Sequence, residues 1–583
     1  MDSIKTNTSE GEKYRIEVTG MSCDSCARHV KKALERVRGV EGVEVPGWKE
    51  GVAFVKVKPG EGGSGVEEEL LKAVRRAGYG AELSEGGAIP PEMEKATGGG
   101  KNQYDSEGYD LMVIGGGSAG FAAAIRGNEL GYRVAIVEES VIGGTCVNVG
   151  CVPSKILIKA VSEYYHARHP RFEAVKTGWS ELSWGKLVEE KDGMVEHLRK
   201  AKYIDVLASY PEIDYIEGKA VLKGENWVEV NGAVYQPGKI IISTGAKTWV
   251  PPIEGLEECG YLTSTTAMEL KELPASMLIL GASAVGIELA QMFARAGVEV
   301  SLVEVAERIA PSMEPEISEE LEKVLKSEGI RIFTGVRVRS VERRNKGRYF
   351  LYCTSGGSSA GGSGGDLAGE FMIEGDSLLV ATGRRPVTGG MGLEEAGVRL
   401  GARGEIVVNR TLRSDNPYIY AAGDVLGKDM FVYTAAYSGS VASENALTGA
   451  ELVYDTRILP GVIFSDPQAA SVGLTEREAR EAGYSVDTTV LPIGHVPIAI
   501  ASRDRYGLVK VVADSGSGEI LGVHILSDEA GSVVEIAAIA MKAGLRIEEL
   551  KNTLFPYLTY AEGLKLAAIT FKKDVAALSC CAV

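Results

Sequence analysis

This 583-residue chain lacks several features, and each absence excludes a class of protein. No apolar run approaches the roughly 18–20 residues that a membrane-spanning helix needs. The first residues, MDSIKTNTSEGEKYRIEV, contain no apolar stretch of the secretory type, so we expect a cytoplasmic protein. The formal net charge of −17 disfavours nucleic acid or an anionic membrane as a partner, because both favour surfaces rich in Lys and Arg.

Cysteine and histidine are also scarce, with eight and six residues respectively. Eight cysteines in a chain of this length do not indicate a disulfide scaffold. In a reducing compartment, close thiol pairs indicate metal binding or redox chemistry. Cys259 and Cys353 stand alone, and we expect both to be small buried residues. The other six form three close pairs: Cys23/Cys26, Cys146/Cys151 and Cys580/Cys581.

The N-terminal part of the chain has the pattern of a small α/β domain. Alternating apolar residues predict strands at YRIEVTG and VAFVKVK and a closing strand at YGAEL, with helices at 25–38 and 66–77. The resulting βαββαβ order is ferredoxin-like. Residues 85–107 are polar and rich in Gly and Pro, which predicts a flexible linker.

Two later segments have the sequence of a dinucleotide-binding turn. In YDLMVIGGGSAGFAAA, a G-x-G-x-x-G motif follows an apolar strand directly. Its glycines permit a tight turn and close approach of a pyrophosphate, which the N-terminus of the following helix can bind. Glu138 ends the next strand, RVAIVE, where a carboxylate can accept hydrogen bonds from ribose hydroxyls. The expected binding residues of this turn are Gly115, Gly117, Ser118, Ala119 and Gly120.

The second segment, SMLILGASAVGIELAQMFARAG, repeats the pattern with Gly281 and Gly286 but has Ser283 at the middle glycine position. Glu304 ends its second strand, VEVSLVE, and no arginine stands beside it at that strand end. A carboxylate there favours the free 2′-hydroxyl of NADH and repels the 2′-phosphate of NADPH. We therefore expect two dinucleotide-binding domains, the second with a preference for NADH.

GGTCVNVGCVPSK, residues 143–155, is the most specific motif inside the chain. Cys146 and Cys151 can close a disulfide or stand as a dithiol, and a helix N-terminus there would stabilise a thiolate. The motif resembles the redox-active disulfide segment of the flavin disulfide reductases, which include dihydrolipoamide dehydrogenase, glutathione reductase and mercuric reductase. The resemblance extends through ATGRRP at 381–386 and YIYAAGDV at 418–425.

The resemblance implies an α/β fold in which two Rossmann-like domains bind FAD and NAD(P)H and an α+β C-terminal domain forms a homodimer. Cys151 would be the thiolate nearest the flavin, and Cys146 would be the exchange thiol facing the substrate. Lys155 and Glu288 would lie near the isoalloxazine ring, and Asp424 would bind the ribityl chain. Further expected cofactor contacts are Gly144, Thr145, Thr244, Gly245 and Gly383.

The C-terminal region departs from the family members that act on thiols. Those members carry an H-P-T-x-S-E segment whose His–Glu pair moves protons, and the corresponding stretch here is YLTYAE. Glu562 is retained, but Tyr557 replaces the histidine, and none of the six histidines lies beyond His524. With a pKa near 10, tyrosine is a poor proton shuttle at neutral pH.

Two cysteine pairs near the chain ends favour a soft metal as the substrate. Adjacent Cys580 and Cys581 form a disulfide only with strain, so they favour the thiol state and can chelate a soft cation. The segment that contains them, YLTYAEGLKLAAITFKKDVAALSCC, resembles the C-terminus of mercuric reductases. GMSCDSC, with Cys23 and Cys26, resembles the metal-binding loop of heavy-metal-associated domains, which copper chaperones share.

Together these features predict mercury detoxification by reduction of thiol-bound Hg(II) to Hg(0). Cys23/Cys26 would capture Hg(II), Cys580/Cys581 would receive it, and Cys146/Cys151 would hold it beside reduced FAD, with Tyr557 assisting ligand transfer. In this family the C-terminal segment closes the neighbouring subunit's active site, so composite sites are expected. A dihydrolipoamide dehydrogenase-like reductase and a soft-metal chaperone acting through its N-terminal domain are the alternatives.

The expected domain boundaries follow from these motifs, and the Gly/Ser-rich residues 355–369 are expected to form a disordered hairpin tip. The boundaries are 12–84 for the heavy-metal-associated domain, 85–107 for the linker, 108–260 and 391–455 for the two parts of the FAD-binding domain, 261–390 for the NAD(P)H-binding domain, and 456–583 for the dimerisation domain with its Cys-Cys tail.

Overall fold

The computed structural model divides the chain into two compact units. Unit 1 consists of Met1–Ile142, Asp205–Gly245 and Thr388–Tyr454, and unit 2 of Gly143–Ile204, Ala246–Val387 and Asp455–Val583. Within the part of the chain that is described, no helix combines the length and the apolar character that crossing a membrane requires. The structure describes residues 12–21, 27, 30–31, 33–34, 37–46, 50–58, 64–76, 79–83, 108–178, 180–344, 347–355 and 369–574.

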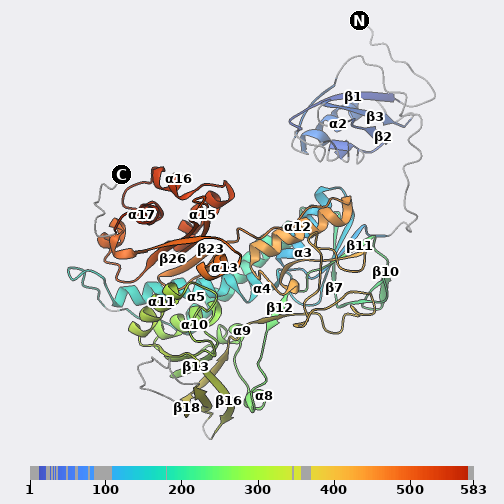
Figure 1. The fold of residues 1–583 in the computed structure, drawn as a ribbon. Coiled ribbons are helices and arrows are strands. Elements are labelled where there is room, and N and C mark those ends of the chain that lie inside the picture. Colours follow the sequence, from blue (N-terminus) through green and yellow to red (C-terminus); the bar gives the residue numbers. More distant parts are fainter. Residues whose placement is uncertain are drawn as a thin grey trace. The chain divides into compact units, whose positions relative to one another are not determined.

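The N-terminal domain is a four-stranded antiparallel sheet in the order β2-β3-β1-β4 (Figure 1). Its core contains Ile16 and Val55 from the sheet and Val30 and Leu34 from the helical residues that follow β1. Leu70 and Val74 add the apolar face of α2, so the predicted ferredoxin-like arrangement is confirmed. The elements are β1 (Glu12–Thr19), β2 (Val40–Glu44), β3 (Val52–Val57), α2 (Ser64–Arg76) and β4 (Gly80–Leu83).

The rest of unit 1 contains a five-stranded parallel sheet in the order β21-β11-β5-β6-β7. Its central strands are buried runs such as LMVI, as expected where helices cover a parallel sheet. Helices α3 and α12 lie side by side (Figure 1). The elements are β5 (Leu111–Ile114), α3 (Ser118–Glu129), β6 (Val134–Glu138), α7 (Asp205–Ala208), β7 (Ile213–Glu217), β8 (Ala220–Leu222), β9 (Val228–Val230), β10 (Ala233–Tyr235), β11 (Lys239–Ile242), β21 (Ile419–Ala421), the 3-10 helix η3 (Gly423–Leu426) and α12 (Val432–Thr448).

Unit 2 contains a second parallel sheet, in the order β15-β14-β13-β19, and an antiparallel sheet of β16, β17 and β18. Ser355 of β17 pairs with Gly369 of β18, so the chain between them, which is not described, joins two paired strands. The elements are α8 (Leu256–Cys259), α9 (Ser264–Ala267), β12 (Ala246–Thr248), β13 (Ser276–Leu280), α10 (Ala284–Arg295), β14 (Glu299–Val303), α11 (Pro315–Ser327), β15 (Arg331–Phe333), β16 (Val336–Arg343), β17 (Tyr349–Ser355), β18 (Gly369–Gly375), β19 (Ser377–Val380) and β20 (Arg384–Pro386).

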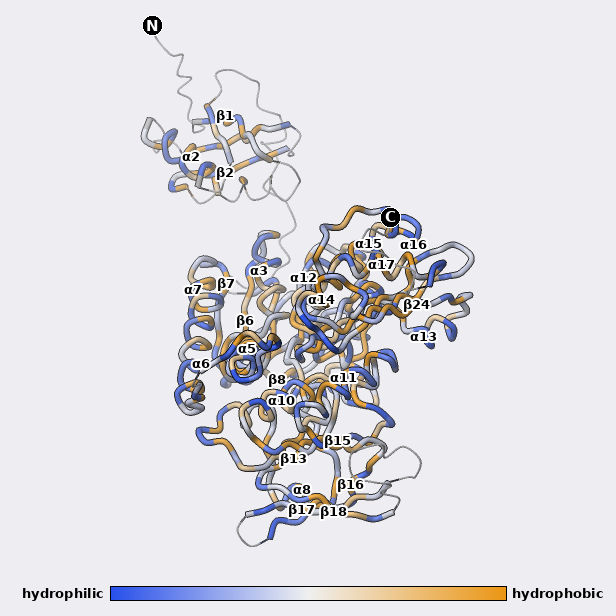
Figure 2. The backbone as a smooth tube through the Cα atoms, turned by 90° about the vertical axis from the view of Figure 1, so that its left-hand side faces the viewer, coloured by the Kyte–Doolittle hydropathy of each residue, from blue (hydrophilic) through white to orange (hydrophobic). Residues whose placement is uncertain are grey.

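The C-terminal part of unit 2 is a five-stranded antiparallel sheet in the order β22-β23-β26-β25-β24, covered by helices. Figure 2 shows hydrophobic residues along the chain near β24 and hydrophilic residues along much of α6. The elements are β22 (Gly461–Ile463), β23 (Gln468–Gly473), α13 (Glu476–Glu481), β24 (Val486–Pro492), η4 (Ile493–His495), α14 (Pro497–Ser502), β25 (Leu508–Asp514), β26 (Ile520–Ser527), α15 (Ala530–Lys542), α16 (Ile547–Asn552) and α17 (Glu562–Thr570).

Helix α5 of unit 2 begins at the cysteine motif. It packs in a core that the second parallel sheet and the C-terminal antiparallel sheet share. Leu157 and Val161 of α5 are fully buried in one core with Phe293 of α10 and Leu526 of β26. Close packing of this kind leaves α5 little freedom to shift, so it is a rigid support for side chains at its N-terminus. The neighbouring elements are α4 (Gly144–Asn148), α5 (Cys151–Arg168), α6 (Trp184–Arg199) and the π-helix η2 (Lys200–Ile204).

Candidate active site

The first glycine-rich turn lies between β5 and α3, as the sequence predicted. Gly115 has a φ of +109°, and a Cβ at Gly120 would collide with its carbonyl oxygen. The Gly116 N–H donates to Glu138 Oε2 at 2.6 Å, and the Ser140 N–H donates to the other carboxylate oxygen at 2.8 Å. The carboxylate is therefore fixed beside a turn that has room only for glycine.

The N-terminus of α3 lies close to the segment that carries Asp424. Ser118 is the first residue of α3, and Gly117 precedes it as the cap residue. A Cβ at Gly423 would come within 2.9 Å of the Ala119 side chain, and Asp424 is the next residue, in the first turn of η3. Helix N–H groups, the oriented carboxylate of Glu138 and Asp424 in one unit fit an FAD-type dinucleotide. Thr244 and Gly245 lie just beyond the end of β11, after Ser243.

The second turn repeats the first in unit 2. The Ala282 N–H donates to Glu304 Oε2 at 2.7 Å, and the Ala306 N–H donates to Oε1 at 2.9 Å. A Cβ at Gly286 would collide with the carbonyl oxygen of Gly281, so the same close helix–turn approach is present. Gly383 follows β19 at the carboxyl end of the same sheet. These residues fit a second dinucleotide.

The thiol pair occupies two consecutive helices. Cys146 lies in α4 and Cys151 is the first residue of α5, and both are thiols rather than disulfide partners. The pKa of Cys151 is lowered to about 6, chiefly because Cys146 hydrogen-bonds to it and also because of the positive charge of Lys155. Desolvation and the charge of Glu288 act in the opposite direction but do not cancel these effects. Cys151 is therefore a thiolate at neutral pH.

Lys155 is held in place one helical turn after Cys151. Its Nζ donates to Glu288 Oε2 at 2.7 Å and lies 4.6 Å from the centre of the Phe464 ring. The other oxygen of Glu288 accepts the Phe464 N–H at 2.9 Å. Glu288 is buried, whereas the Lys155 side chain is 31% exposed, and the ion pair fixes the ammonium group beside the thiolate.

The loop between the two cysteines has a brace that the sequence analysis did not identify. Asn148 donates through Nδ2 to the Gly144 carbonyl at 2.9 Å and accepts from Arg199 Nη1 at 3.2 Å. A Cβ at Gly150 would lie 2.9 Å from the Thr145 carbonyl oxygen, so this turn is tightly closed. Arg199 is 51 residues from Asn148, and no local sequence pattern announces such a contact.

The C-terminal candidates Tyr557 and Glu562 lie on either side of a short turn. Tyr557 is 54% exposed, and Glu562 is the first residue of α17. Glu562 Oε2 is buried without a hydrogen-bond partner among the described residues, and burial raises the pKa of this carboxyl group. The predicted metal ligands Cys23, Cys26, Cys580 and Cys581 lie outside the described residues.

The two isolated cysteines are placed differently. Cys353 is buried, which confirms the expectation, and desolvation raises the pKa of its thiol to about 12. Cys259 is only partly buried and donates weakly to the Val341 carbonyl at 3.6 Å.

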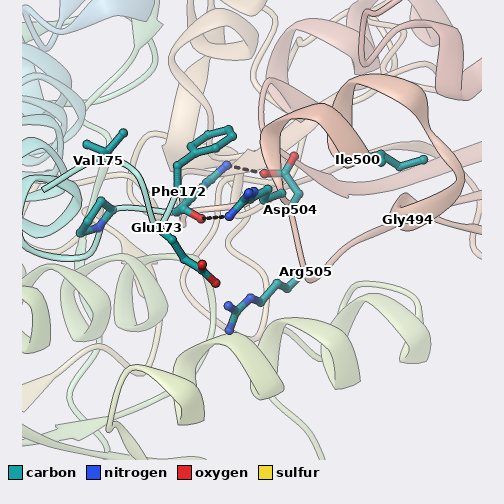
Figure 3. A pocket seen from close by; sticks show the side chains of 10 residues that line it. Phe172, Glu173, Val175, Gly494, Ile500, Asp504 and Arg505 are labelled. Atoms are coloured by element: carbon teal, nitrogen blue, oxygen red, sulfur yellow. Dashed lines mark hydrogen bonds and ion pairs between the residues drawn. The ribbon is translucent and has the colours of Figure 1, made fainter.

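A cavity of about 640 Å³ lies in unit 2 between the segment after α5 and the loop around α14 (Figure 3). Arg171 pairs with Asp504, and the Arg503 guanidinium lies 4.7 Å from the centre of the Phe172 ring. None of the described residues that line this cavity is a cysteine.

Comparison with known proteins agrees with this geometry. Residues 109–439 match the pyridine nucleotide-disulphide oxidoreductase family, residues 459–568 its dimerisation domain, and residues 15–80 the heavy-metal-associated domain. The chain is 29% identical to the HOCl-induced flavoprotein disulfide reductase RclA from Escherichia coli, whose Cu(II) complex has been solved. That match covers 80% of this chain and 100% of the other, with a TM-score of 0.69.

Curated relatives are more similar and extend over nearly the whole sequence. The mercuric reductase of Lysinibacillus sphaericus is 40% identical, over 98% of this chain and 100% of its own. That of Staphylococcus aureus is also 40% identical, over 98% and 99%. The mercuric reductase of Streptomyces lividans is 44% identical over 82% of this chain and 98% of its own. The chain belongs to the pyridine nucleotide-disulphide oxidoreductase family and, within it, to the mercuric reductases.

Proposed function

We propose that this protein reduces thiol-bound Hg(II) to Hg(0) with electrons from a nicotinamide cofactor that pass through FAD. The observation that carries the proposal is the Cys146/Cys151 pair, in which one thiol is already ionised at neutral pH. A soft dication prefers thiolate ligands, so a preformed thiolate can attack it without a separate base. The absence of a histidine at Tyr557 fits a reaction that delivers no proton to its product.

The first step would be an exchange of ligands at the thiol pair. Hg(II) arrives with two thiolate ligands, the Cys151 thiolate and the Cys146 thiol replace them, and one thiolate and one thiol leave. NADH would become NAD⁺ by giving up a hydride, which amounts to two electrons and one proton. The two electrons would convert Hg(II) into Hg(0), which leaves both cysteines as thiolates, and the proton would return to Cys146, so that the pair regains its starting state. FAD, when bound, supplies the two-electron carrier between NADH and the metal.

The remaining site residues have supporting roles in this proposal. Glu138, Asp424 and the turn from Gly115 to Gly120 would bind FAD, and Lys155 with Glu288 would lie against its ring system. Tyr557, assisted by Glu562, would aid ligand transfer at the inner pair. The domain boundaries expected from the sequence, from 12–84 to 456–583, are part of the same proposal.

We also propose that NADH is preferred to NADPH. Glu304 is held by two backbone N–H groups where a ribose would bind, and its negative charge opposes a 2′-phosphate. Arg308, four residues later, donates its guanidinium to the carbonyls of Pro311 and Met313 at 3.0 and 3.1 Å. Nη2 of Arg308 is therefore engaged within the protein, and its Nε is buried.

A homodimer with composite sites completes the proposal. Large apolar side chains are exposed in the dimerisation region, among them Ile539 of α15 at 69% and Leu554 at 90%. Exposed apolar groups of this size indicate a surface that another chain covers. Light scattering on the purified full chain should give twice the monomer mass, and a monomer would contradict this part of the proposal.

The central experiment uses the purified full chain with NADH, Hg(II) and excess small-molecule thiol. We expect NADH oxidation that depends on Hg(II), release of elemental mercury vapour, and little turnover with lipoamide. Brisk lipoamide turnover without mercury vapour would contradict the proposal. Cys151→Ser should abolish the reaction.

The relay is tested by two further variants of the same chain. Cys580→Ala/Cys581→Ala should lose most activity with thiol-bound Hg(II), and unchanged activity would refute a role for the tail. A chain that lacks residues 1–100 should still reduce Hg(II) in vitro, and total loss of activity would show that the N-terminal domain is required for the reaction itself.

A further inference from the structure

One face of helix α10 carries three polar residues that all bind the segment from Phe464 to Asp466. Glu288, Gln291 and Arg295 are spaced three and four residues apart, so their side chains lie on the same side of the helix. Most of α10 is otherwise buried and apolar, which makes this polar row unusual. Each of the three side chains contacts both this segment and another part of unit 2.

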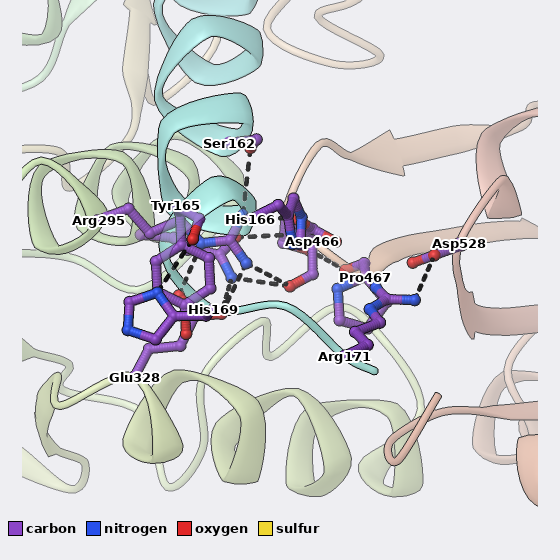
Figure 4. A network of polar contacts seen from close by, with 12 residues as sticks. Ser162, Tyr165, His166, His169, Arg171, Arg295, Glu328, Asp466, Pro467 and Asp528 are labelled. Atoms are coloured by element: carbon purple, nitrogen blue, oxygen red, sulfur yellow. Dashed lines mark hydrogen bonds and ion pairs between the residues drawn. The ribbon is translucent and has the colours of Figure 1, made fainter. Parts of the chain in front are cut away.

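Arg295, at the C-terminal end of α10, is the most heavily engaged. Its side chain is 4% exposed, and it forms a two-pronged pair with Glu328 at 2.7 and 2.8 Å. Its Nη1 donates to Asp466 Oδ2 at 2.6 Å and to Ser162 Oγ of α5 at 3.1 Å. His166, also on α5, approaches the same Asp466 oxygen at 2.7 Å (Figure 4).

The charge environment shows that Asp466 is ionised here. Hydrogen bonds from His166 and Arg295 and the positive charge of Arg295 hold the pKa of Asp466 well below its usual range, although burial opposes them. The Asp466 carboxylate therefore joins α5 to α10 at this end of both helices. Arg295 presents its N–H donors in a fixed plane, so it holds the Asp466 carboxylate in a defined orientation.

Gln291 and Glu288 continue the row toward the thiol pair. Gln291 exchanges two hydrogen bonds with the backbone of Asp466, each 2.8 Å long. Two residues earlier in that segment, the Phe464 N–H donates to Glu288, whose other oxygen holds Lys155. The Phe464 ring in turn lies against the Lys155 ammonium group.

These contacts form a closed ring that includes Lys155. Starting from Lys155, the ring passes through Glu288, along α10 to Arg295, across to Asp466, and back through Phe464 to Lys155. Ser162 and His166 connect the same ring to α5, the helix that begins at Cys151. A closed ring resists displacement of any one member, because each is held from two directions.

We propose that Arg295 and Asp466 are positioning residues for the thiol site, which hold Phe464 and the Lys155–Glu288 pair in place beside Cys151 from the far end of helices α5 and α10. Neither residue touches the thiols. This inference rests on the proposed function for its effect on turnover, while its structural part stands independently of the substrate.

The test compares four variants of the full-length holoenzyme. Asp466→Asn keeps the size and the backbone bonds to Gln291 but removes the charge. Arg295→Met removes the guanidinium, and Arg295→Lys is the conservative variant that keeps a positive charge. Arg399→Met is the matched control, because it breaks an ion pair of similar length, 2.9 Å to Asp415, on the exposed surface of unit 1.

The first readout is hydrogen–deuterium exchange in peptides that cover 461–467 and 520–527. Asp466→Asn and Arg295→Met should speed exchange around Phe464 about tenfold and leave β26 unchanged. The alkylation rate of Cys151 at neutral pH should fall several-fold in the same variants. Turnover with thiol-bound Hg(II) should show a several-fold lower kcat with an unchanged KM for NADH, partly restored by Arg295→Lys.

Each contrary outcome has a definite meaning. Equal acceleration of exchange in β26 would show that the pair serves only to fold the unit, and unchanged exchange around Phe464 would refute the ring. If Arg295→Met does not fold, Asp466→Asn tests the proposal in its place. If exchange and alkylation respond as expected but no mercury vapour is formed by the parent enzyme, the proposed function fails and the positioning role stands.

Discussion

The backbone N–H of Ala282 donates a 2.7 Å hydrogen bond to Glu304, so this carboxylate is oriented by the nucleotide-binding turn itself. Gly116 and Glu138 form the same bond at 2.6 Å in the first turn, with the same separation of 22 residues. In both places a backbone N–H of the turn orients the carboxylate. If each acid binds a ribose as we propose, it is positioned before the cofactor arrives, which reduces the ordering that binding requires.

Glu304→Gln should weaken NADH binding. It should also reduce the ratio of kcat/KM for NADH to kcat/KM for NADPH. A hydrogen bond to a charged group contributes about 1.5–3 kcal/mol, so we expect KM for NADH to rise about 10- to 100-fold. Steady-state kinetics with both cofactors provides the measurement. Glu299 is exposed at the start of β14, the strand that Glu304 follows. Glu299→Gln should change neither the KM for NADH nor the KM for NADPH. A strong NADPH preference in the parent enzyme would show that Glu304 does not select NADH.

Cys151 should react with iodoacetamide over an unusual pH range. Because its pKa is lowered to about 6, it is half ionised near that pH, and reactivity is lost as the pH falls through 6. Cys353, with a pKa of about 12 and a buried side chain, should stay unmodified at neutral pH. Mass spectrometry of alkylated peptides across a pH series measures both. A midpoint near 9 for Cys151 would contradict the assignment.

Cys146→Ala and Cys146→Ser should affect that midpoint differently. The hydrogen bond from Cys146 is the largest cause of the lowered Cys151 pKa, so Cys146→Ala should move the alkylation midpoint upward, toward that of an ordinary thiol. Serine keeps a donor at the same position and should preserve part of the effect. The same pH series serves as the assay, and identical midpoints for the two variants would show that the hydrogen bond is not the cause.

Lys510→Met should destabilise the protein strongly. The Lys510 ammonium is 2% exposed and contacts Glu314, Glu316 and Glu476 at 2.8–3.0 Å, so its removal leaves the buried Glu314 carboxylate without its cation. Breaking a buried pair in this way costs about 3–5 kcal/mol. Chemical denaturation of the full-length protein would measure the loss in the free energy of unfolding.

The matched control for this prediction is Lys323→Met, which breaks an exposed pair with Glu320 and should cost at most about 1 kcal/mol. Adding Glu314→Gln to Lys510→Met should recover stability, because the unpaired charge is removed. Equal effects of Lys510→Met and Lys323→Met would show that burial of the lysine is unimportant.

Gly286→Ala should abolish binding of the nicotinamide cofactor while the protein keeps its flavin. A Cβ there collides with the Gly281 carbonyl oxygen, so α10 cannot approach the turn as closely as it does. Gly193→Ala in α6 is the control, because nothing lies near its Cβ position and alanine favours the helix. Flavin absorbance and titration with NADH distinguish the two. Normal NADH binding by Gly286→Ala would contradict the steric argument.

The parts of the site that follow local patterns could be predicted from the sequence. Glu138 and Glu304 were identified because each ends a strand after a glycine-rich turn, and the structure places both beside those turns. The βαββαβ order of the N-terminal domain was visible because alternating and helical periodicities differ. The family resemblance implies that Lys155 and Glu288 both lie near the isoalloxazine ring. The structure shows that Lys155 donates a hydrogen bond to Glu288.

Contacts between distant segments could not be predicted in this way. Arg295 and Asp466 are 171 residues apart, and Asn148 and Arg199 are 51 apart, so no local periodicity connects either pair. Arg295 would be assigned from sequence alone to an exposed helix end, whereas it is buried because Asp466 and Glu328 compensate its charge. Composition and motifs also do not predict that the thiol motif belongs to the same compact unit as the second parallel sheet.

The pairing of Ser355 with Gly369 offers a practical opportunity. Strands β17 and β18 pair in continuous register from Tyr349 and Gly375 to Ser355 and Gly369. Lengthening the connection between two such strands costs only the slowly growing entropy of closing a larger loop. A fluorescent reporter or an affinity handle grafted between these two residues should therefore leave both nucleotide turns and the thiol pair undisturbed.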